Sequence, residues 1–131
     1  MSEKILRIEV PLLPPASLSP NARVNWRFEW RDKRIYGEAV FYYAIDARNR
    51  SDDYTPFEVA RIDIELVYPV KRIRDVDNAI ASFVSGQNSL VRAGILKGDD
   101  HNHLHWGNVM LTVDKDRAPL TIITLTEETQ G

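Results

Sequence analysis

Two aspartates separated by one residue stand in the stretch RDVDN, residues 74–78, directly before a long run with helical periodicity. Carboxylates this close repel each other, and a divalent cation between them removes the repulsion. Metal ions held by carboxylates can make water nucleophilic and stabilise the leaving oxygen in phosphodiester hydrolysis. A simpler interpretation is that Asp75 or Asp77 caps the helix, where its charge gains about 0.3–1 kcal/mol from the helix dipole. Capping explains one carboxylate, whereas a metal site explains both.

A second acidic pair, Asp99 and Asp100, lies beyond the predicted helix in the stretch KGDDHNHLH. These carboxylates are candidate ligands of a metal shared with the first pair. A helix over residues 78–93 would be about 24 Å long, and the segment 94–100 spans roughly 20 Å only when it is nearly extended. We therefore expect either that the chain doubles back along the helix or that a partner subunit completes the site.

Three histidines alternate directly after this pair: His101, His103 and His105. An extended segment would place all three on one side, where with Asp99 they resemble a zinc or manganese site. Three ligands along one strand are poorly placed to surround a single ion. A solvated strand edge beside the acids is therefore the favoured interpretation, and a zinc-binding structural protein is the weaker one.

Basic and aromatic side chains interleave in the segment 22–34. The basic residues are Arg23, Arg27, Arg31, Lys33 and Arg34, and the aromatic residues are Trp26, Phe28 and Trp30. This mixture contacts phosphates through charge and unpaired bases through stacking. The alternative is that the aromatic rings belong to the core and the arginines cover them. We favour DNA contact for the arginines and the core for the tryptophans.

Hydrophobic periodicity predicts the elements that must position these residues. The expected strands cover 4–10, 61–68, 109–113 and 120–125, and the expected helices run from about Arg31 to Arg50 and over 78–93. The second helix should end at Gly94, and the last two strands should form a hairpin around a polar turn. Ile35, Ala39, Tyr42 and Tyr43 are spaced for one face of the first helix. The order β-α-β-α-β-β predicts an α+β fold with helices packed on a largely antiparallel, mixed sheet.

Length and composition limit the function. A chain of 131 residues predicts a single domain over 1–131. Because the net charge is -2, any phosphate-binding surface must come from local clustering of Lys and Arg. The absence of cysteine excludes disulfides and thiolate metal sites. No apolar stretch is long enough for a signal peptide or a membrane span, which predicts a cytoplasmic protein.

The stretch RDVDN, the amphipathic helix ending in AG and the later DD resemble the signature of the RusA family of Holliday-junction resolvases, especially its phage and prophage members. The early SPNARVNW is similar to the N-terminal segment of that family, so the likeness runs from the first strand to about His105. It implies a compact α+β domain that acts as a homodimer in DNA recombination and repair. It also implies an endonuclease that depends on magnesium, or on manganese in its place, and cuts paired strands at a four-way DNA junction.

This resemblance also assigns roles to individual residues. The positions that match the family's metal-binding and catalytic acids are Asp75, Asp77, Asp99 and Asp100, with Asp100 preferred over Asp99 as the third catalytic acid. Asn78 matches the asparagine of the motif, whereas the family's helix lysine falls on Ala81 or Val84. Other cations would then contact phosphate in its place: Lys71, Arg72, Arg74 or Lys97. A module of the same fold that binds branched DNA without cutting it is the alternative function.

Overall fold

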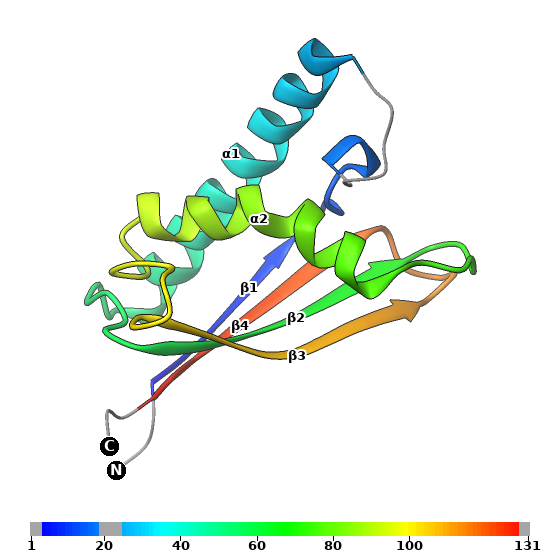
Figure 1. Cartoon of the computed structure of the whole chain (residues 1–131). Helices are drawn as coiled ribbons and strands as arrows, with labels where there is room; N and C mark the ends of the chain where they lie inside the picture. Colours follow the sequence, from blue (N-terminus) through cyan, green and yellow to red (C-terminus); the bar gives the residue numbers. More distant parts are fainter. Residues whose placement is uncertain (1–3, 19–24, 129–131) are drawn as a thin grey trace.

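Two α-helices lie on one face of a four-stranded sheet in the part of the chain that the structure describes, residues 4–18 and 25–128 (Figure 1). The structure is a computed structural model. Its elements are β1 (Ile5–Val10), the short 3₁₀ helix η1 (Ala16–Leu18), α1 (Trp26–Ser51), β2 (Ala60–Tyr68), α2 (Val76–Arg92), β3 (Leu104–Val113) and β4 (Leu120–Glu127). The predicted α+β fold and its order of elements are confirmed. No helix among these residues is both long and apolar enough to cross a membrane.

Strand β2 lies inside the sheet, whose order is β1-β4-β2-β3. It pairs antiparallel with β4 and parallel with β3. The predicted hairpin between 109–113 and 120–125 is therefore wrong, because β2 separates the two strands. Helix α2 carries the chain back across the sheet after β2, so β3 starts at the same end as β2 and runs beside it. β2 suits this central place because Leu66 and Val67, which point to opposite faces, are both buried.

Helix α1 begins at Trp26, well before the predicted start near Arg31. Asn25 is its N-cap, and the side-chain oxygen of Asn25 accepts a hydrogen bond from the Arg27 N–H at 2.9 Å. Asparagine is a preferred N-cap residue because this hydrogen bond satisfies a backbone donor that the helix leaves open. The sequence therefore contained the signal for the true start.

The face of α1 that packs on the sheet also differs from the predicted one. Its buried residues include Tyr36, Val40, Ala44 and Ala47. Ile35 and Tyr42, which were expected on the buried face, are exposed. The Tyr36 hydroxyl donates to Thr121 Oγ1 at 3.0 Å, and the Thr121 hydroxyl donates to the Leu12 carbonyl at 2.6 Å. This buried chain of hydrogen bonds fixes which side of α1 faces β4.

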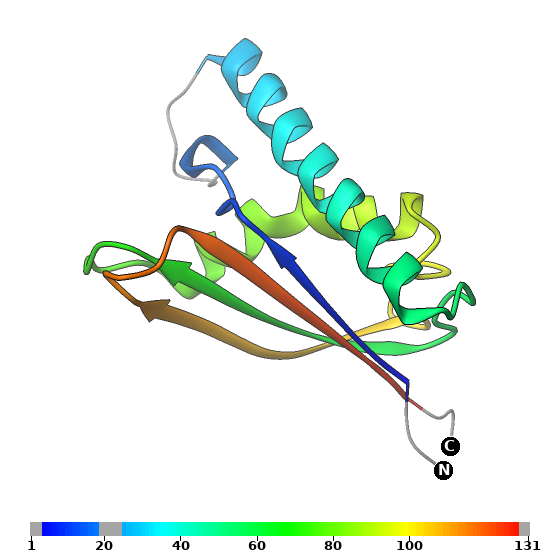
Figure 2. The same cartoon turned by 180° about the vertical axis from the view of Figure 1, so that it is seen from behind.

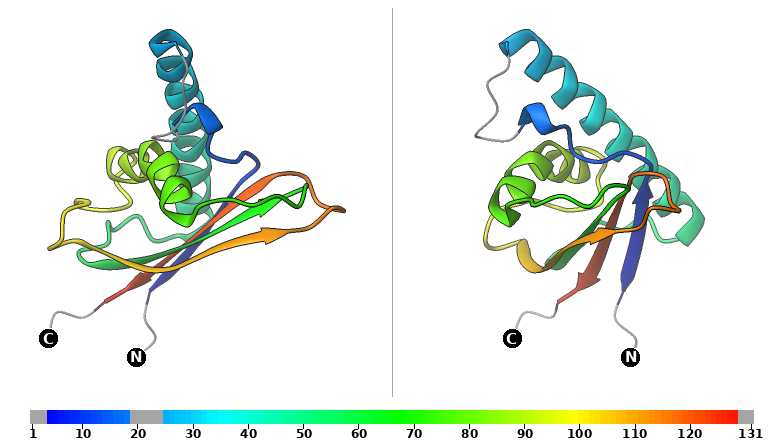
Figure 3. Two further views of the ribbon diagram at one scale, coloured as in Figure 1. Left: turned by 45° about the vertical axis from the view of Figure 1, so that its right-hand side comes forward. Right: turned by 90° about the vertical axis from the view of Figure 1, so that its right-hand side faces the viewer.

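The first turns of α1 extend beyond the sheet, whereas its later turns lie over β1 (Figures 2 and 3). The large apolar side chains of the extending turns are Trp26, Phe28, Trp30 and Ile35, and all four are exposed. The sheet therefore supports only part of α1.

Helix α2 ends as predicted. Gly94 has a φ of 75°, and its N–H donates to the Val91 carbonyl at 3.0 Å. The Ile95 N–H donates to the Leu90 carbonyl, also at 3.0 Å. These two bonds form a Schellman motif, in which glycine adopts the left-handed backbone without strain. Phe83 and Leu90, on the predicted apolar face, are fully buried.

Candidate metal and nucleic-acid site

The loop between β2 and α2 is folded around Arg74. Its guanidinium donates to the carbonyl oxygens of Val70 at 3.1 Å and Arg72 at 3.2 Å. The same group lies 3.7 Å from the centre of the Tyr68 ring, a cation–π contact. Arg74 is thus engaged with the backbone and the ring, and it forms no ion pair with Asp75 within the described part of the chain.

Asp75 occupies the N-cap position of α2, but its side chain makes no capping hydrogen bond. Its backbone carbonyl accepts from the Ala79 N–H at 3.1 Å, and its carboxylate lies 3.4 Å from the Asn78 amide nitrogen. Asp77 follows in the first turn of the helix, and both aspartates are exposed. Among the residues that the structure describes, neither carboxylate has a cationic partner. A side-chain capping hydrogen bond therefore does not account for Asp75, although the helix dipole favours both charges at this end of α2.

A hollow of about 410 Å³ lies beside this helix start. Its lining includes Tyr68, Arg72, Asp75, Asn78 and Ser82. The hollow thus brings a guanidinium, a carboxylate, an amide and a hydroxyl to one space. A guanidinium suits a phosphate group, and a carboxylate next to that phosphate requires a metal cation between the two anions.

The donors at the start of α2 fit magnesium or manganese. Hard cations prefer oxygen ligands, and Mg²⁺ usually binds through one or two carboxylates together with substrate phosphates and water. Asp75 supplies one such carboxylate to the hollow, and Asp77, in the same helix turn but not among the residues that line the hollow, would supply a second. Over residues 4–18 and 25–128, no three His, Cys, Asp or Glu side chains come together as a metal-binding group. A cation at this site would therefore take further ligands from the substrate or from a second subunit.

The second acidic pair lies away from the first. The chain does double back along α2, one of the two expected arrangements, and Asp99 Oδ2 lies 3.5 Å from the Gln87 amide nitrogen. Gln87 is about 15 Å along the helix axis from Asp77. The chain after α2 therefore does not return far enough to bring Asp99 to the first acidic pair. The parallel pairing of β2 with β3 gives the reason, because the end of one strand and the start of the other lie at opposite ends of the sheet.

Asp100 is held by contacts within its own loop. Its carboxylate accepts from the Asn102 N–H at 2.8 Å and lies 2.9 Å from His103 Nδ1. The Asn102 N–H and then His103 lower the pKa of Asp100 below its ordinary value. The carboxylate therefore stabilises the turn that leads into β3.

The three histidines do not lie along one strand. β3 begins just after His103, so only His105 belongs to a strand, while His101 and His103 lie in the preceding turn. The expectation that an extended segment aligns them is wrong, because the His103 N–H donates to the Asp100 carbonyl at 3.0 Å and closes the turn. His105 lies 2.9 Å from Glu128 Oε2, which raises the pKa of His105.

The cations predicted to contact DNA after β2 fall into two groups. Lys71 and Arg72 are exposed in the β2–α2 loop next to Asp75. Lys97 lies at the other end of the sheet, where its N–H donates to the Phe57 carbonyl and its ammonium pairs with Glu58. Lys97 therefore belongs to the neighbourhood of the second acidic pair.

The basic and aromatic residues of α1 form a surface of their own. The guanidinium of Arg27 lies 5.4 Å from the centre of the Trp26 ring, and that of Arg31 lies 4.9 Å from the Phe28 ring. Both rings are exposed, as is Trp30, so the prediction that these tryptophans belong to the core is wrong. The early turns of α1 extend past the sheet, and no strand of the described chain lies under them (Figures 2 and 3). Arg23, also predicted to contact DNA, lies outside the described residues.

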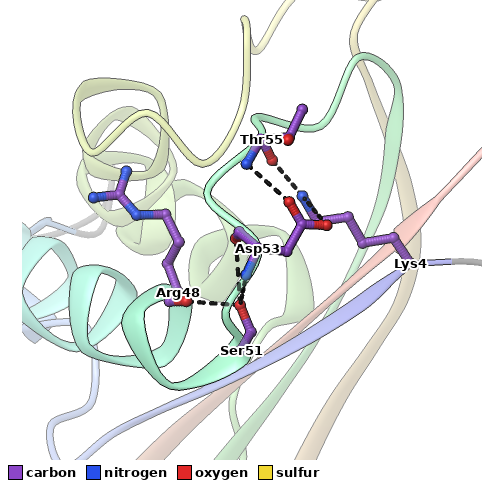
Figure 4. Close-up of polar contacts among 5 residues, drawn as sticks. All are labelled: Lys4, Arg48, Ser51, Asp53 and Thr55. Atoms are coloured by element: carbon purple, nitrogen blue, oxygen red, sulfur yellow. Dashed lines mark hydrogen bonds and ion pairs between the residues drawn. The ribbon is translucent and has the colours of Figure 1, made fainter.

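A second hollow, of about 320 Å³, lies where α1 meets β1. Its polar groups pair mainly with one another (Figure 4). Lys4 Nζ lies 3.5 Å from Asp53 and also donates to the Thr55 carbonyl. Asp53 accepts from the Thr55 N–H at 2.9 Å, and the Ser51 hydroxyl donates to the Arg48 carbonyl at 2.7 Å. This cluster joins the end of α1 to the sheet.

Three side chains of α2 were not identified from the sequence as candidate ligand-binding residues. Ser85, Asn88 and Arg92 line a groove against α1, together with Lys33 and Arg34. Spacings of three and four residues place Ser85, Asn88 and Arg92 on one side of the helix, which is a signal visible in the sequence. Only the packing of α1 against that side makes it a groove.

Comparison with known proteins adds no relationship to this picture. No protein-family model matches the sequence, and no curated protein matches it significantly. The likeness to the RusA family therefore remains a prediction from short sequence motifs.

Proposed function

We propose that the protein is a metal-dependent, structure-selective endodeoxyribonuclease that resolves four-way DNA junctions in the cytoplasm during recombination and repair. The observation that supports this most is the pair Asp75 and Asp77, two exposed carboxylates with no cationic partner in the described chain, beside an arginine that is engaged elsewhere. The two like charges repel each other, and a cation between them would remove that repulsion. The resemblance of RDVDN to the RusA motif supports the same function.

The residues around the first turn of α2 suit phosphate chemistry. A bound magnesium ion would supply a Lewis acid and an activated water. Asp75 and Asp77 would hold that ion, and the Asn78 amide would orient the Asp75 carboxylate. Lys71 and Arg72 would contact the DNA backbone, and the open N–H groups of the helix start favour an anion there.

A homodimer is part of this proposal. The two acidic pairs flank α2 at its opposite ends, and one chain returns only as far as Gln87. A second copy could bring Asp99 or Asp100 of one chain toward the Asp75–Asp77 pair of the other. Two symmetric sites would also match the twofold symmetry of a four-way junction.

A binding module that does not cut is the alternative function. The family's helix lysine falls on Ala81 or Val84, and α2 contains no lysine. Without that cation, the acids could bind a metal and branched DNA while the phosphodiester bond stays intact. Cleavage assays separate the two functions.

The substitution Asp77→Asn tests the proposal directly. Asparagine keeps the shape of aspartate and removes its charge, so we expect cleavage of a labelled four-way junction in magnesium to be lost while the melting temperature is retained. Junction affinity in chelator should be equal or tighter, because a carboxylate that faces a phosphate without its cation is repulsive. Cleavage, melting temperature and junction affinity are measured for the wild type and the variant.

Matched variants separate a metal role from a helix-start role. Asp116→Asn changes an exposed aspartate in the β3–β4 turn and should cut like the wild type. If Asp77 only stabilises the helix start through its charge, Asp77→Asn would cut fully, and Asp77→Asn and Asp77→Ala would each lose about 0.3–1 kcal/mol of stability. Full cleavage by Asp77→Asn would overturn the metal-site assignment. A wild type that binds junctions but never cuts them in magnesium or manganese would identify the binding module.

A further inference from the structure

The groove between α1 and α2 has a volume of about 440 Å³. Its lining includes Trp30, Lys33 and Arg34 from α1 and Ser85, Asn88 and Arg92 from α2. The helices pack closely beside it, since the Ser89 hydroxyl donates to the Gly37 carbonyl at 2.6 Å. A Cβ atom on Gly37 would come within 3.2 Å of Ser89 Oγ. Small residues at this crossing therefore let charged side chains from both helices border one space.

Three cations border the groove, against one acid, Glu38. Arg34 Nε lies 3.1 Å from Glu38 Oε1, so one cation is paired. Lys33 has no hydrogen bond or ion pair with any residue that the structure describes. Arg92 stacks over the Phe41 ring at 4.9 Å, a contact that leaves its charge uncompensated. The groove is thus positively charged in a protein whose net charge is -2, which favours an anionic ligand.

Ser85 lines the groove, and its hydroxyl oxygen is buried beneath the groove surface without a hydrogen-bond partner in the described chain. Ser85 is only 8% exposed, and its Oγ atom has no partner within the described chain. A buried polar group that lacks a partner is unfavourable. Rotation of the Ser85 side chain toward the groove would let this hydroxyl donate to a bound oxygen acceptor. A phosphate oxygen would also neutralise the charges of Lys33 and Arg92.

An exposed aromatic ring lies at the same groove. Trp30 is 59% exposed, and the Arg34 guanidinium lies 5.6 Å from the centre of its ring. Exposed rings beside a cationic groove stack unpaired bases, because every base presents a π-face. Bases inside a duplex are already stacked and do not offer that face.

We propose that the α1–α2 groove binds a phosphate of single-stranded nucleic acid and that the base next to this phosphate stacks on Trp30. The proposal deepens the proposed function and rests on it for the identity of the strand as DNA. It names a contact for unpaired nucleotides near a junction, separate from the acids at the start of α2. Ser85 donates to the phosphate, while Lys33 and Arg92 neutralise it.

Tryptophan fluorescence of the full chain, titrated with a short oligothymidylate in chelator, tests the proposal without cleavage chemistry. A plot of log affinity against log salt has a negative slope. For the double variant Lys33→Ala/Arg92→Ala we expect this slope to become shallower by roughly 0.7 for each phosphate that the protein no longer neutralises. For Trp30→Leu we expect affinity to fall by about fivefold or more, because the base has no ring to stack on. Lys115→Ala, which removes an exposed lysine from the β3–β4 turn, should bind like the wild type.

Ser85→Ala distinguishes ligand binding from a structural role. Because the variant removes a hydroxyl that has no partner, the free protein should melt at the same temperature or higher, yet bind the oligonucleotide more weakly. Inorganic phosphate and an abasic oligonucleotide separate the two parts of the ligand. Both should compete, and affinity for the abasic strand should not depend on Trp30.

The outcomes separate this proposal from the proposed function. Oligonucleotide binding that resists every groove variant would overturn the groove, even if Asp77→Asn abolishes junction cleavage. An acidic peptide that competes as well as the oligonucleotide would also overturn it, in favour of a protein partner. If the groove variants weaken binding but the wild type never cuts junctions, the groove proposal would stand and the proposed endonuclease activity would be wrong.

Discussion

The two halves of α1 belong to one helix but have different surroundings. Over 26–35 the large apolar side chains are exposed, and over 36–47 the apolar side chains Tyr36, Val40, Ala44 and Ala47 are buried. In the ribbon, the early turns extend beyond the sheet and the later turns lie over it (Figure 3). Trp30 is 59% exposed, whereas Tyr36, less than two turns later, is fully buried. Aromatic residues thus have opposite roles within one helix.

Each exposed ring of the early half is paired with an arginine. Arg27 lies over Trp26, Arg31 over Phe28 and Arg34 over Trp30. Cation–π contacts at exposed sites are worth about 0.5–1 kcal/mol, far less than burial of a large aromatic ring. A row of exposed rings is typical of a binding surface, so the comparison separates a half that is open to a ligand from a half that holds the fold.

The largest expected difference between the two halves is in the free energy of unfolding when one aromatic side chain is removed from each. Tyr36→Ala should lower the free energy of unfolding by about 3–5 kcal/mol, because it empties a fully buried site. Trp30→Ala should change it by about 0.5 kcal/mol or less. Chemical denaturation of both variants measures the difference.

Tyr36→Phe refines this prediction. It keeps the ring and removes the hydrogen bond to Thr121, so we expect a loss of about 1 kcal/mol. Similar losses for Trp30→Ala and Tyr36→Ala would break the comparison, because they would mean that both halves hold the fold.

A smaller effect is expected for arginines on the two halves. Arg27→Ala should reduce the slope of log junction affinity against log salt by about 0.9, the value of one phosphate contact on duplex DNA. Arg50→Ala removes an exposed arginine near the end of the same helix, where it pairs with Asp46, and should leave the slope unchanged. The measurement is junction binding in chelator over a series of salt concentrations. An unchanged slope for Arg27→Ala would assign that arginine to ring stacking alone.

The smallest effect concerns pH at the end of the buried half. The Thr55 N–H, above all, lowers the pKa of Asp53, so the ionised carboxylate favours the folded state. This stabilisation is present above the ordinary carboxyl pKa and is lost as pH falls through the lowered pKa of the folded protein. Asp53→Asn should therefore melt below the wild type at pH 7, and the gap should close in strong acid. A difference in melting temperature that does not depend on pH would show that ionisation of Asp53 does not contribute to the loss of stability in acid.

Local patterns predicted the elements well. The alternation over 61–68, the helix stop at Gly94 and the helix start at RDVDN were confirmed, because alternation, positive φ and helix ends depend on neighbours in the chain. Asn25 also carried a local signal for the start of α1. The exposure of Trp26 and Trp30 could not be predicted from interleaved basic and aromatic residues, since exposure depends on whether a strand lies beneath the helix.

The sequence by itself determined the α+β class, most element positions and the candidate acids at both ends of α2. Only the tertiary structure decided that β2 separates β3 from β4, and that Asp99 lies beside Gln87, a residue about 15 Å along α2 from Asp77. It also decided which half of α1 is buried and that Ser85 and Arg92 border a groove with Lys33. The physical reason is that strand order and burial arise from contacts between residues far apart in the chain, whereas periodicity and helix ends arise from neighbours.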